Sequence, residues 1–233
     1  MKSLFAGLIP LSLILLSSCA SVSVKGEQRT AGKPVRKPAK IYVADFDTTK
    51  GVYKIAGAEN KDPEAFKKKI AGLLTGYVVK SVNDHVAPAQ QAASTHGLPR
   101  SGWLVTGEFV RVCTGSRLLR AGIGLGAGGS KMETRVSIID LAGNSKPFMT
   151  FETTGGSNAM PGLLESSGPG SAVISMTTQS MMGVTDDAAR TSRMIAGELN
   201  TYLIERGWLS KDKKYSVKKL GDYQLVHEQY FHQ

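Results

Sequence analysis

The chain has 233 residues, of which 41% are apolar and 21% are charged, a composition typical of a globular protein that excludes a disordered one. The formal charge at pH 7 is +10, which favours anionic partners such as lipid head groups or cell-wall polymer; a solvated basic surface without a specific partner would carry the same charge. No second long apolar run follows Leu16, so we expect no transmembrane helix.

The first residues have the layout of a secretory signal peptide. Lys2 precedes an apolar stretch from Leu4 to Leu16 that is too short to span a bilayer, and small residues follow it. The four residues that end at Cys19, Leu-Ser-Ser-Cys, resemble the lipobox of bacterial lipoproteins, which implies cleavage before Cys19 and attachment of acyl chains to it. We therefore predict a lipoprotein signal peptide over residues 1–18 and lipidation at Cys19. The alternative is an ordinary secretory signal with a coincidental cysteine.

The residues after Cys19 bear on the location of the protein. In lipoproteins of double-membrane bacteria an aspartate after the cysteine commonly retains the protein in the inner membrane; here Ala20 stands there, so the resemblance implies an outer-membrane protein that faces the periplasm. Residues 19–38 are rich in glycine, proline and basic side chains, and we expect an acylated, basic, flexible tether there. This location argues against nucleic acid and favours membrane lipid, another envelope protein or self-association as the partner.

The first half of the folded region is predicted to contain one strand and one long helix. Residues 40–46 form a short apolar run with strand character. A helix follows from about Asp62, with Pro63 in its first turn and apolar side chains at helical spacing up to Val82. We expect Pro88 to end or bend this helix, and residues 87–93 to form a short alanine-rich helix.

The second half is predicted to contain three strands and a second long helix. The strands cover residues 103–113, 131–141 and 147–154, with a hairpin turn at 142–145 and a loop over 155–170. The helix is predicted from Thr185, as its N-cap, to Arg206, with Gly207 as its C-cap. Cys113 ends the first of these strands, and we expect a buried core thiol there, because an acylated Cys19 cannot form a disulfide.

The element order β-α-β-β-β-α defines the expected fold class. It predicts an α+β domain over residues 39–209, in which a mixed or antiparallel sheet packs against two long helices. Residues 210–233 are polar and basic, and we predict a C-terminal tail there.

A glycine-rich segment lies between the first two of the three later strands. Gly124, Gly126 and Gly129 satisfy the G-x-G-x-x-G spacing of dinucleotide-binding loops, but that motif requires a helix directly after it, and the residues that follow alternate like a strand. We therefore expect no nucleotide and interpret the segment as a structural connection or a contact loop. The predicted contact loop comprises Gly122, Gly124, Gly126, Gly128, Gly129 and Lys131.

The same region resembles a known family. The glycine-rich turn, Ser130-Lys131 and the alternating strand up to Gly143 are similar to the bacterial lipoproteins of the family called domain of unknown function 4410, over about residues 40–206. This resemblance implies no established reaction and no catalytic residues. More distantly, the first strand and the helix after it resemble envelope lipoproteins of the curli-secretion type, which assemble into oligomers; the long pore-forming insertions of that group are not evident in this sequence.

Three other groups of residues approach catalytic or metal-binding motifs without completing them. Ser157 sits in a near match to the G-x-S-x-G nucleophile elbow, but a proline and a glycine follow where the motif requires a helix. His227 and His232 are one residue too far apart for a zinc-protease helix, which favours a mobile tail. Asp45 and Asp47 alternate on a strand without a third ligand, which favours a strand-end turn.

Together these patterns predict a non-catalytic envelope lipoprotein that binds or assembles with other components at the outer membrane. We expect no catalytic residue, no metal and no cofactor. The alternative is a periplasmic hydrolase or a metal-dependent enzyme, which a deep pocket with converging histidine, aspartate and serine side chains would indicate.

Overall fold

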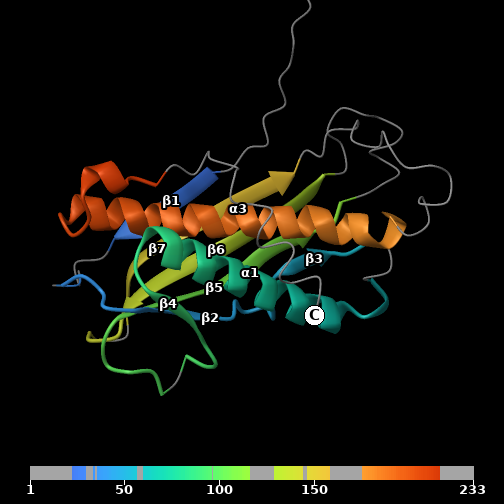
Figure 1. The fold of residues 1–233 in the computed structure, drawn as a ribbon. Coiled ribbons are helices and arrows are strands. Elements are labelled where there is room, and N and C mark those ends of the chain that lie inside the picture. The colour runs from blue at the N-terminus through green and yellow to red at the C-terminus, as the bar shows by residue number, and fades with distance from the viewer. Residues whose placement is uncertain are drawn as a thin grey trace, which may run out of the picture.

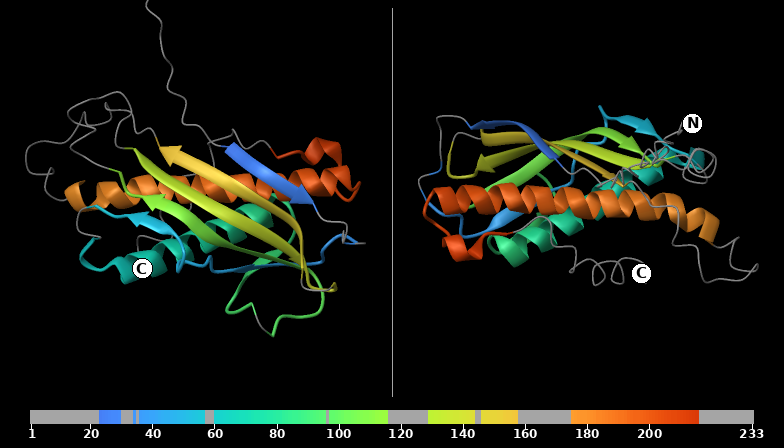
Figure 2. Two further views of the ribbon diagram at one scale, coloured as in Figure 1. Left: turned by 180° about the vertical axis from the view of Figure 1, so that it is seen from behind. Right: turned by 90° about the horizontal axis from the view of Figure 1, so that it is seen from above.

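The computed structural model describes residues 23–29, 34, 36–56, 60–95, 97–115, 129–143, 146–157 and 175–215. The described strands form one sheet, and two long helices, α1 (Pro63–His85) and α3 (Ser175–Glu205), lie side by side on one of its faces (Figure 1). Figure 2 shows the same two layers from above, with both helices on one side of the strands. The predicted α+β class, a mixed sheet packed against two long helices, is confirmed.

The sheet combines an antiparallel half and a parallel half. Its strands are β1 (Ser23–Arg29), β2 (Ile41–Ala44), β3 (Val52–Lys54), β4 (Ala89–Ala92), β5 (Trp103–Cys113), β6 (Ser130–Asp140) and β7 (Pro147–Ser157). They are arranged in the order β1-β7-β6-β5-β2-β4, and β3 pairs with β5. The pairs β1–β7, β7–β6 and β6–β5 are antiparallel, and the last two join strands that are consecutive in the chain. Strands β2, β3 and β4 run parallel to their neighbours.

Strands β2 and β3 lie one after the other along the same edge of β5. Ile41 pairs with Trp103 at one end of β5, and Val52 pairs with Arg111 at the other end. Between them, the isolated bridge from Asp47 to Glu108 keeps the intervening chain against β5. The two short strands therefore follow the full length of the long one, with a turn after Asp47 in place of continuous pairing.

Helix α1 begins where the sequence predicts. The side chain of Asp62 caps its first turn by accepting a hydrogen bond of 2.9 Å from the backbone N–H of Ala65, and Pro63 occupies a first-turn position, where its missing N–H costs nothing. The apolar stripe of the helix is buried, with Ile70, Leu74 and Val78 all fully inaccessible to solvent. Burial of each such side chain stabilises the fold by roughly 1.5–3 kcal/mol.

Helix α3 is longer than predicted at its N-terminal end. It starts at Ser175 rather than Thr185, and Thr185 is a buried residue in the helix and not an N-cap. The physical reason is that Met181 and Val184 continue the buried stripe of the helix toward its N-terminus, and both belong to the core. At the other end Gly207, at φ +70, ends the helix as predicted, because its left-handed conformation suits glycine.

Residues 23–29 form an edge strand within the segment that was predicted to be a tether. Ser23 pairs with Thr154 of β7, and Arg29 pairs with Met149. Gly26 is one of the glycines on which the prediction of a flexible tether depends. It has φ +62 and lies at a register shift between β1 and β7. A glycine in this conformation allows a bulge, so the strand continues past it.

Residues 89–92 form strand β4 and not the predicted alanine-rich helix. They pair in parallel with β2, from Ile41 and Ala89 at one end to Ala44 and Ala92 at the other. Helix α1 ends at His85, and Pro88 favours an extended chain directly before β4. A strand of four residues is too short for an alternating pattern to be recognised in the sequence. The alanines of this segment therefore favoured the prediction of a helix.

Strand β7 also extends further than predicted. It runs to Ser157, so Gly155 and Gly156 belong to the strand and not to the predicted loop over 155–170. A Cβ atom at Gly155 would lie 3.4 Å from both the backbone oxygen of Asp187 and the hydroxyl of Thr191 on α3. The helix thus lies within van der Waals distance of the strand backbone at this glycine.

Gly107 of β5 offers a test of the packing between the sheet and the chain that follows β2. A Cβ atom there would lie 2.4 Å from the backbone oxygen of Arg135 and 2.6 Å from the ring of Phe46. Because a backbone atom cannot move aside easily, we expect Gly107→Ala to lower the free energy of unfolding by about 1–3 kcal/mol, measured by urea denaturation.

Gly72 of α1 provides the matched control. A Cβ atom at this helical position meets nothing within 4 Å. The change Gly72→Ala should therefore stabilise the protein, by up to about 1 kcal/mol, because alanine has the higher helix propensity. Equal effects of the two alanine substitutions would contradict the close packing at Gly107.

Candidate functional site

The face of the sheet opposite the helices carries a band of ion pairs. Arg135 of β6 lies 2.5 Å from Glu108 of β5 and 2.8 Å from Glu152 of β7. Further along β6, Glu133 is shared by Lys131 at 2.6 Å and by Arg111 at 3.6 Å. These side chains are solvent-exposed or half-exposed, so each pair contributes little to stability, roughly 0–1 kcal/mol. The band makes this face of the sheet polar.

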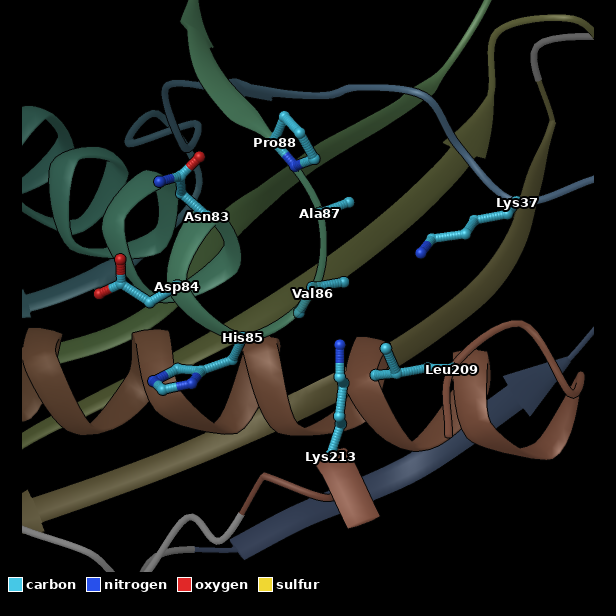
Figure 3. Close-up of a pocket in the computed structure, with 9 residues that line it drawn as sticks. All are labelled: Lys37, Asn83, Asp84, His85, Val86, Ala87, Pro88, Leu209 and Lys213. Atoms are coloured by element: carbon cyan, nitrogen blue, oxygen red, sulfur yellow. The ribbon is translucent and has the colours of Figure 1, made fainter. Parts of the chain in front are cut away.

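A groove of about 520 Å³ lies at the C-terminal end of α1. Figure 3 shows Lys37 and Lys213 reaching toward it from different segments of the chain. Its residues are Lys37, Asn83, Asp84, His85, Val86, Ala87, Pro88, Leu209 and Lys213. Asp84 pairs with Lys80 at 2.6 Å, and the ring of His85 stacks on Tyr215 with 3.8 Å between centroids. The carboxylate of Asp84 and the imidazole of His85 are thus both engaged in contacts with neighbouring side chains.

Asn200 of α3 holds this end of the molecule together. It is completely buried, and its amide nitrogen donates to the backbone oxygens of His85, at 2.8 Å, and Lys213, at 3.1 Å. Its side-chain oxygen accepts a hydrogen bond of 3.0 Å from the backbone N–H of Tyr215. One side chain therefore connects α3, the end of α1 and the chain after η2 (Lys211–Lys213), so regular contacts extend beyond residue 209 into the predicted tail.

Strand β1 is attached to α3 through Arg29. Its guanidinium forms ion pairs with Glu205 of α3 and with Glu27, and it lies 5.4 Å from the centre of the Tyr202 ring. Glu198, half-buried on α3, belongs to the same neighbourhood. Burial, and then the charge of Glu27, raises the pKa of Glu198 above its ordinary value, with Arg29 acting in the opposite direction.

A second polar region joins α3 to the end of β7. Asp187 and Thr191 are completely buried on α3, close to Gly155. Arg190 donates a hydrogen bond of 3.2 Å to the backbone oxygen of Gly156 and lies 3.5 Å from the carboxylate of Asp187. These contacts join the helix to the end of the strand.

Few of the residues predicted from sequence to form a site lie in the described part of the chain. Cys19, the glycines at 122, 124, 126 and 128, and the histidines at 227 and 232 are outside the described residues. Gly129 and Lys131 lie just before and at the start of β6, where Lys131 pairs with Glu133. Ser157 ends β7.

Of the two aspartates near the end of β2, Asp47 forms the turn that the sequence favours, and Asp45 contacts the neighbouring strand. The carboxylate of Asp47 accepts a hydrogen bond of 2.8 Å from the backbone N–H of Thr49, and this bond lowers the pKa of Asp47. Asp45 accepts a hydrogen bond of 3.1 Å from Gln91. Among the described residues, no three histidine, cysteine, aspartate or glutamate side chains are grouped so that they could hold a metal ion.

Cys113 is half-buried rather than a core thiol, and a strand irregularity is the reason. The register between β5 and β6 shifts between Phe109 and Arg111. Phe109 and Val112 therefore both face the core, and Cys113 falls on the opposite face, where it pairs with Lys131. Strict alternation from Phe109 would have placed Cys113 inside, and the sequence contained no signal for the bulge.

The described residues thus define an α+β domain with a band of surface ion pairs and a groove at the end of α1. In the described ranges, no helix is long and apolar enough to cross a membrane. The model of the family described as "Domain of unknown function (DUF4410)" matches residues 41–173, from the start of β2 to just before α3. The match covers more than half of the chain, and the chain belongs to this family. No curated protein matches it.

Two solved structures of PelC from Paraburkholderia phytofirmans show a weak similarity. The PelC dodecamer aligns with a TM-score of 0.39 and 11% identity over 73% of this chain and 95% of that chain. The dodecamer of a variant with a single substitution aligns with a TM-score of 0.38 and 10% identity, over 71% and 98% of the two chains. Both TM-scores lie below 0.5, and a similarity of this size does not establish a shared function.

Replacing Asn200 tests whether its hydrogen bonds hold together the chain segments around the groove. Replacement by alanine removes three hydrogen bonds and leaves buried backbone groups without partners, so Asn200→Ala should lower the free energy of unfolding by about 2–4 kcal/mol. Hydrogen exchange of the Tyr215 amide, measured by mass spectrometry, should become faster. Gln91→Ala, which removes an exposed hydrogen bond to Asp45, serves as control and should stay within about 0.5 kcal/mol. Unchanged exchange at Tyr215 would contradict the role of Asn200.

Glu198 gives a prediction for pH dependence. Because the folded-state pKa of its carboxyl is raised, folding favours the protonated form, and the protein loses stability as the pH rises from the unfolded pKa through the folded one. Glu198→Gln removes this penalty and should raise the urea midpoint at pH 7. The difference from the unchanged protein should shrink at acidic pH, where Glu198 is protonated in both states. A difference that is constant across this range would contradict the raised pKa.

Proposed function

We propose that this chain is a lipid-anchored protein of the bacterial envelope, held at the outer membrane through acylated Cys19, that acts by binding or assembly and not by catalysis. The observation that carries the proposal is the Leu-Ser-Ser-Cys sequence ending at Cys19, directly after an apolar segment of signal-peptide length. Acyl chains on this residue anchor a protein without a spanning helix. The first described strand, β1, begins four positions later, at Ser23.

The described surface supports a binding role. Its acidic side chains on the open face of the sheet are engaged in ion pairs with Arg111, Lys131 and Arg135. Lys131, at the start of β6, belongs to the contact loop predicted from sequence. The sheet also ends in two edge strands, β1 and β4, whose outer backbone groups face no other described strand. Such surfaces suit another envelope protein or a second copy of this chain.

The alternative function, a periplasmic hydrolase or a metal-dependent enzyme, has one structural feature in its favour. The groove at the end of α1 contains His85 and Asp84, but the histidine is stacked on Tyr215 and the carboxylate pairs with Lys80. A panel of hydrolase substrates distinguishes the two functions. Turnover that is lost on changing Ser157, His227 or Asp45 would decide for the enzyme.

Cys19→Ser tests the anchored function directly. Without the cysteine, acyl chains cannot be attached, so the protein should leave the membrane fraction or keep its uncleaved signal peptide. Fractionation of cells and mass spectrometry of the intact protein measure both outcomes, and Cys113→Ser is the matched control that should leave location and lipid mass unchanged. An unaltered mass and membrane association in Cys19→Ser would overturn the proposal.

A further inference from the structure

We propose that the end of the sheet at which β1 begins faces the membrane, and that its basic side chains contact anionic lipid head groups. This inference rests on the proposed acylation of Cys19 and adds an orientation and a lipid-contacting surface to it. The membrane-facing end is defined by Val52, Lys54, Arg111 and Lys131, together with Ser23.

The distance between anchor and sheet is short. Only residues 20–22 separate Cys19 from Ser23, and Ser23 is paired with Thr154 at the edge of the sheet. Four Cα–Cα steps of a fully extended chain span at most about 14 Å. Whatever conformation these residues adopt, the start of β1 cannot move further than this from the acylated cysteine. Because β1 begins at Ser23, the sheet is not connected to the anchor by a long tether that would allow any orientation.

The register of the sheet shows which residues share this end. Ser23 pairs with Thr154, Thr154 with Glu133, Glu133 with Arg111 and Arg111 with Val52. These pairs form one row across the sheet, about 19 Å wide at about 4.8 Å per strand. Lys131 and Lys54 lie two residues beyond this row, on the side from which the chain enters β1. They are therefore on the anchored side of the row.

The charge and exposure of this end suit an anionic lipid surface. The side chains of Arg111 and Lys131 are 48% and 40% exposed, and they share a single acid, Glu133. Lys54 is exposed on β3. Val52 is 52% exposed and is the one exposed large apolar side chain among the described residues. A basic surface with an exposed apolar side chain, held near the bilayer by an acyl chain, favours contact with anionic head groups.

The opposite end of the sheet is also basic, so charge alone does not select the orientation. Lys40 and Arg100 lie there, near the start of β5. The two ends are separated by the length of β6, which extends from the Cys113–Lys131 pair to the Trp103–Asp140 pair, about 30 Å. The position of the anchor therefore decides which end of the sheet faces the membrane. Because the two ends are about 30 Å apart, their distances from the lipid head groups can be told apart.

The experiment measures the distance of each end from the lipid head groups. Full-length protein is produced with its signal, purified and reconstituted into vesicles of phosphatidylglycerol and phosphatidylcholine that carry a fluorescent acceptor on their head groups. A donor dye is attached either at Val52→Cys or at Ser101→Cys, an exposed position at the opposite end, each in a Cys113→Ser background. We expect several-fold more energy transfer from position 52 than from position 101.

Charge variants test the contact with lipid. The double variant Lys54→Gln, Lys131→Gln should reduce transfer from position 52, whereas the matched double variant Lys40→Gln, Arg100→Gln at the far end should not. Vesicles of phosphatidylcholine alone should reduce the transfer from position 52 in the same way. If the charge variants and the lipid composition have no effect, anionic lipid is not the partner of this surface and the inference is overturned.

The outcomes separate this inference from the proposed function. An acylated, vesicle-bound protein that gives equal transfer from both positions, or more transfer from position 101, overturns the orientation alone. A protein whose mass shows no lipid on Cys19 and that does not associate with vesicles overturns the proposed function, and the inference with it.

Discussion

The packing of α3 against the long strands β6 and β7 is the contact on which most of the described structure depends. Buried side chains along the helix, from Met181 to Leu203, meet the alternate residues of the strands that face it. At Gly155, where the strand has no side chain, the helix comes within van der Waals distance of the strand backbone. Polar groups add directional contacts at two places on the helix: Arg190 bonds to the backbone of β7, and Asn200 bonds to the end of α1. Hydrophobic burial thus supplies most of the stability, and the hydrogen bonds select one alignment of helix and sheet.

The long elements could be predicted from the sequence because each carries a repeated signal. Helix α1 has an aspartate cap, a proline in its first turn and an apolar stripe. Strands β6 and β7 alternate over many residues, and β5 is a long run of residues with strand character. Gly207 ends α3 as expected. These features are local, so their physical causes are contained in neighbouring residues.

The elements that were missed owe their conformation to distant partners. Strand β4 has only four residues and is extended because β2 lies beside it, and β1 is ordered by pairing with β7 across a bulge at Gly26. The position of Cys113 depends on a register shift that only the pairing with β6 reveals. In the sequence, Asn200 does not differ from the other polar residues of its helix. Its role depends on partners such as His85, which lies 115 residues away in the chain. Most of the predicted contact loop lies outside the described residues, so its role stays a prediction.

The direction of β1 has a mechanical consequence. In an antiparallel pair the hydrogen bonds run perpendicular to the strands, so a pull on the chain before Ser23, directed along the strand, loads the bonds between β1 and β7 together in shear. A pull across the strand would instead open them one after another from the end. Further along β1, Arg29 adds its ion pair with Glu205 to the resistance. A short connection to a membrane would therefore transmit lateral and normal forces unequally to the folded protein, with the greater resistance along the axis of the strand.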